Sequence, residues 1–276
     1  MPAYFLPTPK LYQSIKALPW VRPVYDFGPN IVIDKALSDL ADLTMDWEKM
    51  KRELQPIPLG ATVLIDFEPG DNNKWAAWDF KTREIRQEVV DTFATMLDVA
   101  KTARPDCRFM FFSCPPLWPN IVKSMETNQL EALLAQKLIT AFAPIVNQTC
   151  AISPGFYRPA GESIGSYIDY VQTYMTLIKR SYPTMPIIPT ISPCLDCGLN
   201  LMPANEFAAI LHAMDVENVI VWATDKENFP QGIKTTDDWM VALQSWEIGN
   251  AIHAKNSIAK ATAESIAYRR SLAMTI

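Results

Sequence analysis

Short apolar runs alternate with longer amphipathic stretches along most of the chain, and this alternation limits the folds that the sequence can adopt. Six runs predict strands, at residues 21–27, 61–67, 108–114, 149–153, 186–191 and 218–224. Six stretches predict helices, near residues 34–54, 81–103, 129–143, 163–181, 203–214 and 235–254. Because strands separated by helices usually pair in parallel, the pattern predicts an α/β fold with a parallel sheet.

Proline follows four of the six predicted strands and marks where the chain leaves the sheet. These pairs are Glu68-Pro69, Cys114-Pro115, Ser153-Pro154 and Ser192-Pro193. The nine glycines form no G-x-G-x-x-G or P-loop motif, which argues against a nucleotide-binding doubly wound sheet. We therefore predict a single (β/α) TIM-like barrel over residues 1–257, with seven strands or an irregular eighth, and a C-terminal helical extension over residues 258–276.

The composition excludes several classes of partner. Of the 276 residues, 49% are hydrophobic and 20% are charged, which suits one sizeable core. The net charge of -5, without a cluster of Lys and Arg, argues against nucleic acid. No uninterrupted apolar run approaches the roughly 18 residues of a membrane span, and no secretory signal is visible, so the compartment stays unknown. The Ala-rich residues 258–276 suggest a homo-oligomer or larger assembly formed through this helix.

The cysteines and histidines do not form a recognisable metal motif. The five cysteines are Cys107, Cys114, Cys150, Cys194 and Cys197. The first three lie in or beside strand-like runs and are expected to be buried thiols. Cys194 and Cys197 form a single C-x-x-C, which we expect in a loop, and the chain has only two histidines, His212 and His253. The sequence therefore predicts no metal and no cofactor.

Two carboxylates, Asp66 and Glu68, stand at the end of the second predicted strand. Because side chains alternate along a strand, they should share one face, while Val63, Ile65 and Phe67 pack on the other. Two like charges at this spacing raise the pKa of one carboxyl group, which suits a general acid. The alternative for such a motif is a pair of structural carboxylates that bind basic neighbours.

Further polar and aromatic side chains lie at or just after predicted strand ends. They are Asp26, Trp75, Trp118, Tyr157, Trp222 and Asp225. In a barrel of this kind the carboxyl ends of the strands form the site, so we expect these residues to bind substrate there. Carboxylates and aromatic rings without histidine indicate sugar chemistry, although each ring can instead pack over the core.

Several short stretches resemble the hyaluronidase family of glycoside hydrolases and keep that family's order over roughly residues 20–250. Val63-Leu-Ile-Asp66-Phe-Glu68 resembles V-x-I-D-W-E, and Val24-Tyr-Asp26-Phe-Gly28 resembles a strand that ends in Y-D-x-G. Pro154-Gly-Phe-Tyr157-Arg-Pro159 resembles Y-P-S-I-Y-x-P, Pro186-Ile-Ile-Pro189 resembles P-V-L-P, and Val219-Ile-Val-Trp222 resembles V-V-L-W. The chitinase motif D-x-x-D-x-D-x-E is met only in part, since Ala61 and Leu64 replace two of its acids.

The resemblance implies a metal-independent hydrolase that acts on a glycan containing N-acetylhexosamine. Glu68 would then be the acid, and Asp66, Tyr157 and Trp222 would orient the acetamido group of the substrate, which attacks the anomeric carbon. An oligo- or polysaccharide is the implied partner.

Three positions depart from the family pattern: Pro69 follows the glutamate, and Ser153 and Thr190 replace tyrosines. These changes keep open a non-catalytic glycan-binding or assembly protein on the same barrel, because a fold does not fix a function. A metal-dependent hydrolase or deacetylase would need ligands that the sequence does not offer.

Overall fold

The computed structural model describes residues 3–5, 21–27, 45–67, 76–192, 194–195 and 200–221. The predicted helix at 235–254, the extension at 258–276 and the first part of the predicted helix at 34–54 lie outside these residues.

The main strands are all parallel to their neighbours. They are β1 (Ala3–Phe5), β2 (Val21–Pro23), β3 (Tyr25–Phe27), β4 (Thr62–Ile65), β5 (Arg108–Phe111), β6 (Gly155–Phe156), β7 (Thr190–Ile191) and β10 (Ile220–Val221). One sheet has the order β2-β1-β10-β7-β6 and the other the order β3-β4-β5. The parallel sheet expected from the sequence is therefore present.

The edge strands of the two sheets meet at two junctions, so the strand pairings form a closed ring. At one junction, only Val24 separates β2 from β3, so the two form one continuous stretch of extended chain. At the other, Phe112 pairs in parallel with Ser153 just before β6, and the Cys150 amide donates to the Phe109 carbonyl at 2.8 Å. Seven strand segments of the described chain thus each have a neighbour on both sides, which is the connectivity of a barrel.

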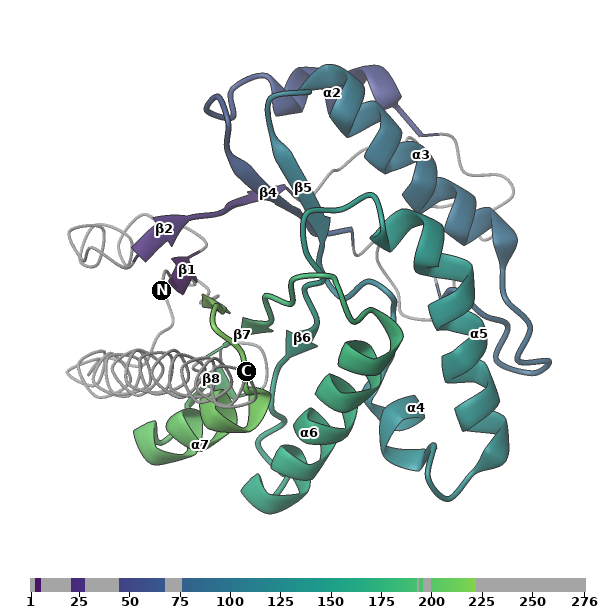
Figure 1. Cartoon of the computed structure of the whole chain (residues 1–276), viewed down its shortest axis with the longest axis vertical. Helices are drawn as coiled ribbons and strands as arrows, with labels where there is room; N and C mark the ends of the chain where they lie inside the picture. The colour runs from purple at the N-terminus through teal and green to yellow at the C-terminus, as the bar shows by residue number, and fades with distance from the viewer. Residues whose placement is uncertain are drawn as a thin grey trace, which may run out of the picture.

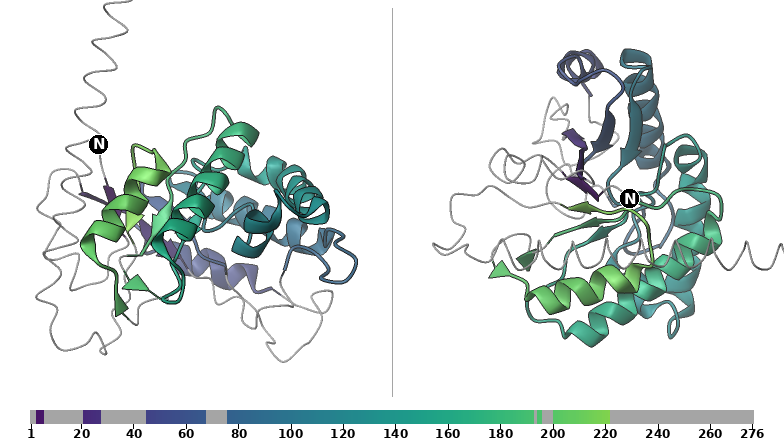
Figure 2. Two further views of the ribbon diagram at one scale, coloured as in Figure 1. Left: turned by 90° about the horizontal axis from the view of Figure 1, so that it is seen from below. Right: turned by 60° about the vertical axis from the view of Figure 1, so that its left-hand side comes forward.

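Six described helices form an outer arc around the strands (Figure 1). They are α2 (Trp47–Leu54), α3 (Gln87–Ala103), α4 (Pro119–Ser124), α5 (Gln129–Val146), α6 (Ile164–Ser181) and α7 (Ala204–Met214). Figure 2 shows from two further directions that α6 and α7 lie side by side. Side-chain caps fix three helix starts: Asp46 accepts from the Lys49 amide at 2.8 Å, Asn128 from the Leu130 amide at 3.0 Å, and Ser163 from the Ser166 amide at 3.2 Å.

The strands carry two separate apolar layers because their side chains alternate. Val63, Ile65 and Phe67 belong to the large cluster between the strands and the helices, as predicted. Leu64, which lies between the first two, belongs to a smaller inner cluster. The buried members of that inner cluster are Val24, Leu64, Met110, Ala151 and Ile220. They come from five different strand segments, so we identify the inner cluster as the filling of the barrel lumen.

Some elements differ from the prediction for identifiable reasons. The short β1 and α4 give too little periodic pattern to be recognised, and α4 begins directly at Pro119. Helix α3 begins at Gln87 rather than near residue 81, because the Asp79 carboxylate holds the Lys81 and Thr82 amides in a turn. The predicted C-x-x-C loop contains a short antiparallel pair, β8 (Cys194–Leu195) with β9 (Asn200–Leu201).

Helix α5 is, within the described part of the chain, the one helix long and apolar enough to cross a membrane by length and composition. Its side chains Leu134, Leu138 and Phe142 are buried in the helix-facing core. The buried Tyr182 hydroxyl also donates to the Ile139 carbonyl of α5 at 2.9 Å. These contacts identify α5 as a core helix of this fold.

The three described thiols are free. Cys114 is buried as expected, and burial raises its pKa well above the ordinary thiol value. Cys107 and Cys150 are only partly buried, so the expectation of full burial is wrong for these two. Cys107 lies just before β5, and its Sγ lies 3.7 Å from the carbonyl oxygen of Pro58.

Candidate functional site

The inner face of the barrel becomes polar toward the carboxyl ends of its strands. Residues two apart on one strand share a face, so each residue of the inner apolar cluster predicts the next inward position. The successive inward pairs are Leu64 and Asp66, Met110 and Phe112, Ala151 and Ser153, and Ile188 and Thr190. Aspartate, serine and threonine thus replace aliphatic side chains at the end where barrel sites form.

Asp66 lies at this polar end of β4. Its amide donates to the Phe27 carbonyl at 3.0 Å, which extends the pairing of β3 with β4 by one residue. Its neighbours Ile65 and Phe67 pack on the helix side, so the half-buried Asp66 lies on the inward side with Leu64. Glu68, its predicted partner, lies outside the described residues, and the shared site of the two carboxylates stays a prediction.

Ser153, two residues before β6, and Thr190, the first residue of β7, form a buried hydroxyl pair. Ser153 Oγ lies 2.8 Å from Thr190 Oγ1, and either oxygen can be the donor. Both residues are 0% exposed. These are the two positions where the hyaluronidase pattern has tyrosines, so this chain replaces two aromatic rings with two short hydroxyl side chains.

Tyr157 stands beside the inward-facing Phe112. Their ring centroids are 5.6 Å apart and the rings are tilted by 31°. Phe112 also covers the backbone of Gly155, where an added Cβ would lie 2.5 Å from two ring carbons. A glycine is therefore required at residue 155 if Phe112 is to keep its place next to Tyr157.

The segment that carries Tyr157 is anchored on the outer side of the barrel. Phe156 packs on Tyr174 of α6, with ring centroids 5.4 Å apart. The buried guanidinium of Arg158 donates to the Glu206 carboxylate of α7 and to the Glu162 carbonyl. Burial raises the pKa of Tyr174 well above its ordinary value, so this phenol stays neutral as part of the packing.

A strained residue, Ser113, follows β5 by two positions. Ser113 has φ of 53°, in the left-handed region that non-glycine residues rarely adopt. Its amide donates to the Ser153 carbonyl at 2.8 Å, which holds this conformation and joins the ends of two strand segments. Backbone strain of this kind often lies at functional sites, and here it lies next to the hydroxyl pair.

Trp118 belongs to a different environment from Asp66. Its ring packs edge-on against Trp78 at 4.8 Å and is tilted against Phe80 at 5.7 Å. This aromatic group packs against the helix-facing core, whereas Asp66 and Ser153 extend from the inner face. Contact of Trp118 with substrate stays a prediction.

Four of the predicted site residues, Trp75, Trp222, Asp225 and Glu68, lie outside the described chain. For Asp26 the backbone alone is described, and it stands in register with Leu64 on the neighbouring strand. Phe112 and Gly155 were not predicted as site residues. A count of two residues onward from Met110 along the apolar strand would have identified Phe112 as inward-facing.

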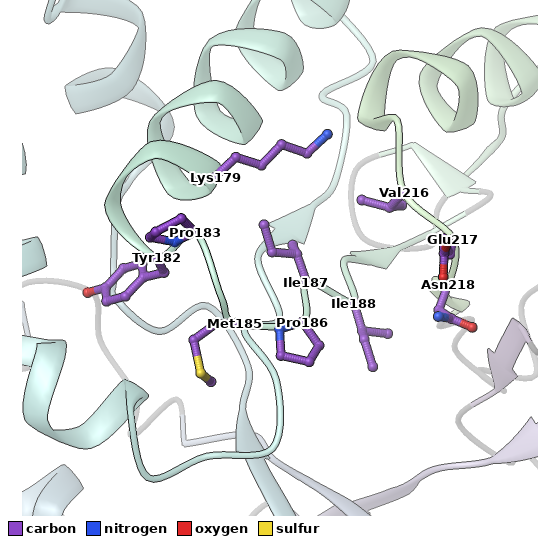
Figure 3. Close-up of a pocket in the computed structure, with 10 residues that line it drawn as sticks. All are labelled: Lys179, Tyr182, Pro183, Met185, Pro186, Ile187, Ile188, Val216, Glu217 and Asn218. Carbon is purple, nitrogen blue, oxygen red and sulfur yellow. The ribbon is translucent and has the colours of Figure 1, made fainter. Parts of the chain in front are cut away.

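A pocket of about 310 Å³ lies away from this polar end. Figure 3 shows it between the end of α6 and the segments that lead into β7 and β10. Tyr182, Pro186, Ile188 and Val216 contribute much of its lining. The Lys179 ammonium at its edge donates to the Asp215 carboxylate at 2.9 Å. Because the pocket lies at the amino ends of the strands, it is distinct from the candidate site.

No arrangement of three or more His, Cys, Asp or Glu side chains suited to a metal ion occurs within the described ranges. Two arginines of the described chain, Arg83 and Arg158, have carboxylate partners. Arg83 binds Glu131 at 2.6 Å, and Arg158 binds Glu206 as described above. These two arginines therefore stabilise the outer layer of the fold.

Most of the chain is similar in structure to bee venom hyaluronidase. Bee venom hyaluronidase aligns with a TM-score of 0.60 and 14% identity, over 91% of this chain and 98% of the other. A complex of bee venom hyaluronidase with a hyaluronic acid tetramer aligns with a TM-score of 0.56 and 13% identity, over 81% of this chain and 91% of the other. No family model matches the sequence, and no curated protein matches it. The distant hyaluronidase-like resemblance expected from the sequence is thus confirmed as a shared fold.

Proposed function

We propose that this protein is a glycoside hydrolase that cleaves a glycan next to an N-acetylhexosamine by substrate-assisted acid catalysis. The observation that carries the proposal is the position of Asp66 at the polar carboxyl end of β4, on the inward side of a hyaluronidase-like fold. The sequence places Glu68 two residues further along the chain, on the same face if the strand continues.

In this mechanism Glu68 protonates the glycosidic oxygen as the bond from that oxygen to the anomeric carbon breaks. The carbonyl oxygen of the neighbouring acetamido group forms a new bond to the anomeric carbon, so no carboxylate of the protein acts as nucleophile. The charge of Asp66 orients the acetamido group and stabilises the positive charge that develops on it. A water molecule, deprotonated by Glu68, then opens the cyclic intermediate and restores the acid.

The substrate partner is an oligo- or polysaccharide. Tyr157, Trp222, Asp26, Trp75, Trp118 and Asp225 are the proposed substrate-binding residues, and Tyr157 has the clearest support, since it lies beside the inward-facing Phe112. A bee venom hyaluronidase with this fold was solved with a hyaluronic acid tetramer, which supports a carbohydrate ligand for the present chain.

Glu68→Gln tests the proposal. The amide keeps the shape of the side chain but cannot donate a proton, so kcat should fall by orders of magnitude while ligand affinity changes little. The assay is release of reducing ends from chitin, chondroitin, hyaluronan and peptidoglycan fragments. Glu53→Gln is a matched control, because Glu53 lies on the exposed side of α2, and its activity should equal that of the wild type.

The second candidate is a non-catalytic glycan-binding or assembly protein on the same fold. The buried Ser153 and Thr190 pair favours it, because this pair replaces the two tyrosines of the hyaluronidase pattern. Glycan binding without turnover of any fragment, unchanged in Glu68→Gln, would support this candidate and exclude the hydrolase.

The domain division also stays a proposal. We propose that residues 1–257 form the barrel and that residues 258–276 form a helix through which copies of the chain assemble. Sedimentation of the full chain and of a chain that ends at residue 257 tests this division. A smaller assembly for the shorter chain is expected, and equal masses would contradict the proposed role of the helix.

A further inference from the structure

The hydrogen-bond ladder between β7 and β10 stops at Pro189. The Ile220 amide donates to the Pro189 carbonyl at 2.7 Å, and from there the pairing runs toward the carboxyl ends, with Ile220 opposite Thr190. Toward the amino ends, the next bond of a parallel ladder would run from the residue 189 nitrogen to the Asn218 carbonyl, and proline has no hydrogen to donate. The pocket of about 310 Å³ lies where this ladder stops, between the segments that lead into the two strands (Figure 3).

Ile187 lines the pocket and has backbone groups that its strand neighbour does not use. The Pro186 carbonyl accepts from the Ile152 amide at 2.9 Å, and the Ile188 amide donates to the Ile152 carbonyl at 2.9 Å. Because backbone groups alternate between the two sides of an extended segment, the Ile187 N–H and C=O face the opposite side, toward the segment that leads into β10. No hydrogen bond to either group comes from the described residues. Ile187 therefore offers one donor and one acceptor next to each other.

Asn218 supplies another unused polar group. Its side chain lines the pocket across from Ile187, and its Oδ1 is buried with no hydrogen-bond partner in the part of the chain that the structure describes. A buried polar atom without a partner costs free energy, which a ligand that donates a hydrogen to it recovers. The pocket thus combines two acceptors and one donor that the fold leaves unused.

The rest of the lining favours an uncharged ligand with an apolar body. The Lys179 ammonium donates to the Asp215 carboxylate at 2.9 Å and to the Asp215 carbonyl at 2.7 Å, so its charge is already balanced. The exposed Glu217 adds a negative charge that disfavours an anion, while Lys179 disfavours a cation. Tyr182 and Pro186 provide flat apolar surfaces on the same wall as Ile187.

We propose that this pocket is a second binding site, separate from the candidate site at the carboxyl ends of the strands, for a compact uncharged molecule that has a primary carboxamide group and a flat apolar body. The carboxamide oxygen accepts from the Ile187 amide, and one of its two N–H groups donates to the Ile187 carbonyl. The other N–H group donates to Asn218 Oδ1. The apolar body packs on Tyr182 and Pro186.

Titration of the ¹⁵N-labelled full chain with benzamide, followed by NMR, tests the proposal. Benzamide should shift the amide resonance of Ile187, because this N–H gains an acceptor. The Ile188 amide is an internal control, since it is already bonded to the Ile152 carbonyl and should shift less. Methyl benzoate has the same ring and a carbonyl group but no N–H, and benzoate has a negative charge, so both should bind more weakly than benzamide.

Asn218→Ala removes one of the two acceptors and should weaken benzamide binding roughly two- to tenfold. Asn120→Ala, on the exposed start of α4, is the matched control and should bind as the wild type does. The proposal is overturned if benzamide at its solubility limit leaves the Ile187 amide unshifted, if methyl benzoate or benzoate binds as well as benzamide, or if folded Asn218→Ala binds with wild-type affinity. The three ligands are compared on the wild-type chain, so that comparison decides the question even if Asn218→Ala does not fold.

Discussion

Phe112 and Gly155 fit together so closely that a Cβ at residue 155 would lie 2.5 Å from Phe112 Cε2 and from Phe112 Cζ, so the ring would have to shift if a side chain were added. The two residues belong to neighbouring strand segments, and Phe112 also packs next to Tyr157 at a centroid distance of 5.6 Å. The position of a proposed substrate-binding tyrosine therefore depends on the absence of a side chain two residues earlier.

Gly155→Ala should destabilise the protein by about 1–3 kcal/mol, because the added methyl group displaces the Phe112 ring. The same variant should weaken glycan binding, since Phe112 moves against Tyr157. Chemical denaturation measures the first effect and calorimetry the second. The control is Gly161→Ala, where nothing lies within 4 Å of an added Cβ. Phe112→Leu in the Gly155→Ala background should recover part of the stability, and a Gly155→Ala protein as stable as the wild type would contradict the fit.

Asp106 should make the stability of the fold sensitive to acid. Its carboxylate accepts from Arg104 Nε at 2.9 Å and from the Gly60 amide at 2.9 Å. The Arg104 guanidinium is the main reason that the pKa of Asp106 lies below its ordinary value. A lowered folded-state pKa means that the stabilisation is complete above the unfolded-state pKa of about 4 and is lost as the pH falls further.

The free energy of unfolding should therefore fall more steeply below about pH 4 in the wild type than in Asp106→Asn. Urea titrations at a series of pH values measure the difference. Asp98→Asn on α3 is a control outside this arginine contact. Parallel curves for the wild type and Asp106→Asn would show that the contact does not contribute to the pH dependence.

The three described thiols should react at different rates. Cys114 is 4% exposed and its pKa is raised by burial, so its reactive thiolate is both rare and inaccessible. Cys107 is partly exposed and should react first with an alkylating reagent, although burial also raises its pKa. Mass spectrometry of peptides after timed labelling gives the order, and labelling of Cys114 before Cys107 in the folded protein would contradict the packing of the β5 end.

Much of the fold follows from local sequence patterns. The strand at Thr62–Ile65 was predictable from its continuous apolar run, and the helices at Gln129–Val146 and Ile164–Ser181 were predictable from their long amphipathic pattern. The strand at Ala3–Phe5 was not, because three residues contain no periodic signal and its pairing with β10 joins distant parts of the chain.

The candidate site was predictable in part for a related reason. The alternation of residues on a strand correctly separates Asp66 from Ile65 and Phe67. The close approach of Phe112 to Gly155, and the bond between Ser153 and Thr190, depend on the register between neighbouring strands, which no single segment of sequence contains. Tertiary register is thus the information that the sequence patterns lack.

The most direct test of the account compares wild-type hydrolysis of matched glycosides that have an N-acetyl or an N-trifluoroacetyl group. Fluorine atoms withdraw electrons from the carbonyl oxygen, so an acetamido group that attacks the anomeric carbon should become a much weaker nucleophile. The account predicts that kcat falls by orders of magnitude for the trifluoroacetyl substrate while its KM changes little. Equal kcat values for the two substrates, or no hydrolysis of the N-acetyl substrate, would contradict it.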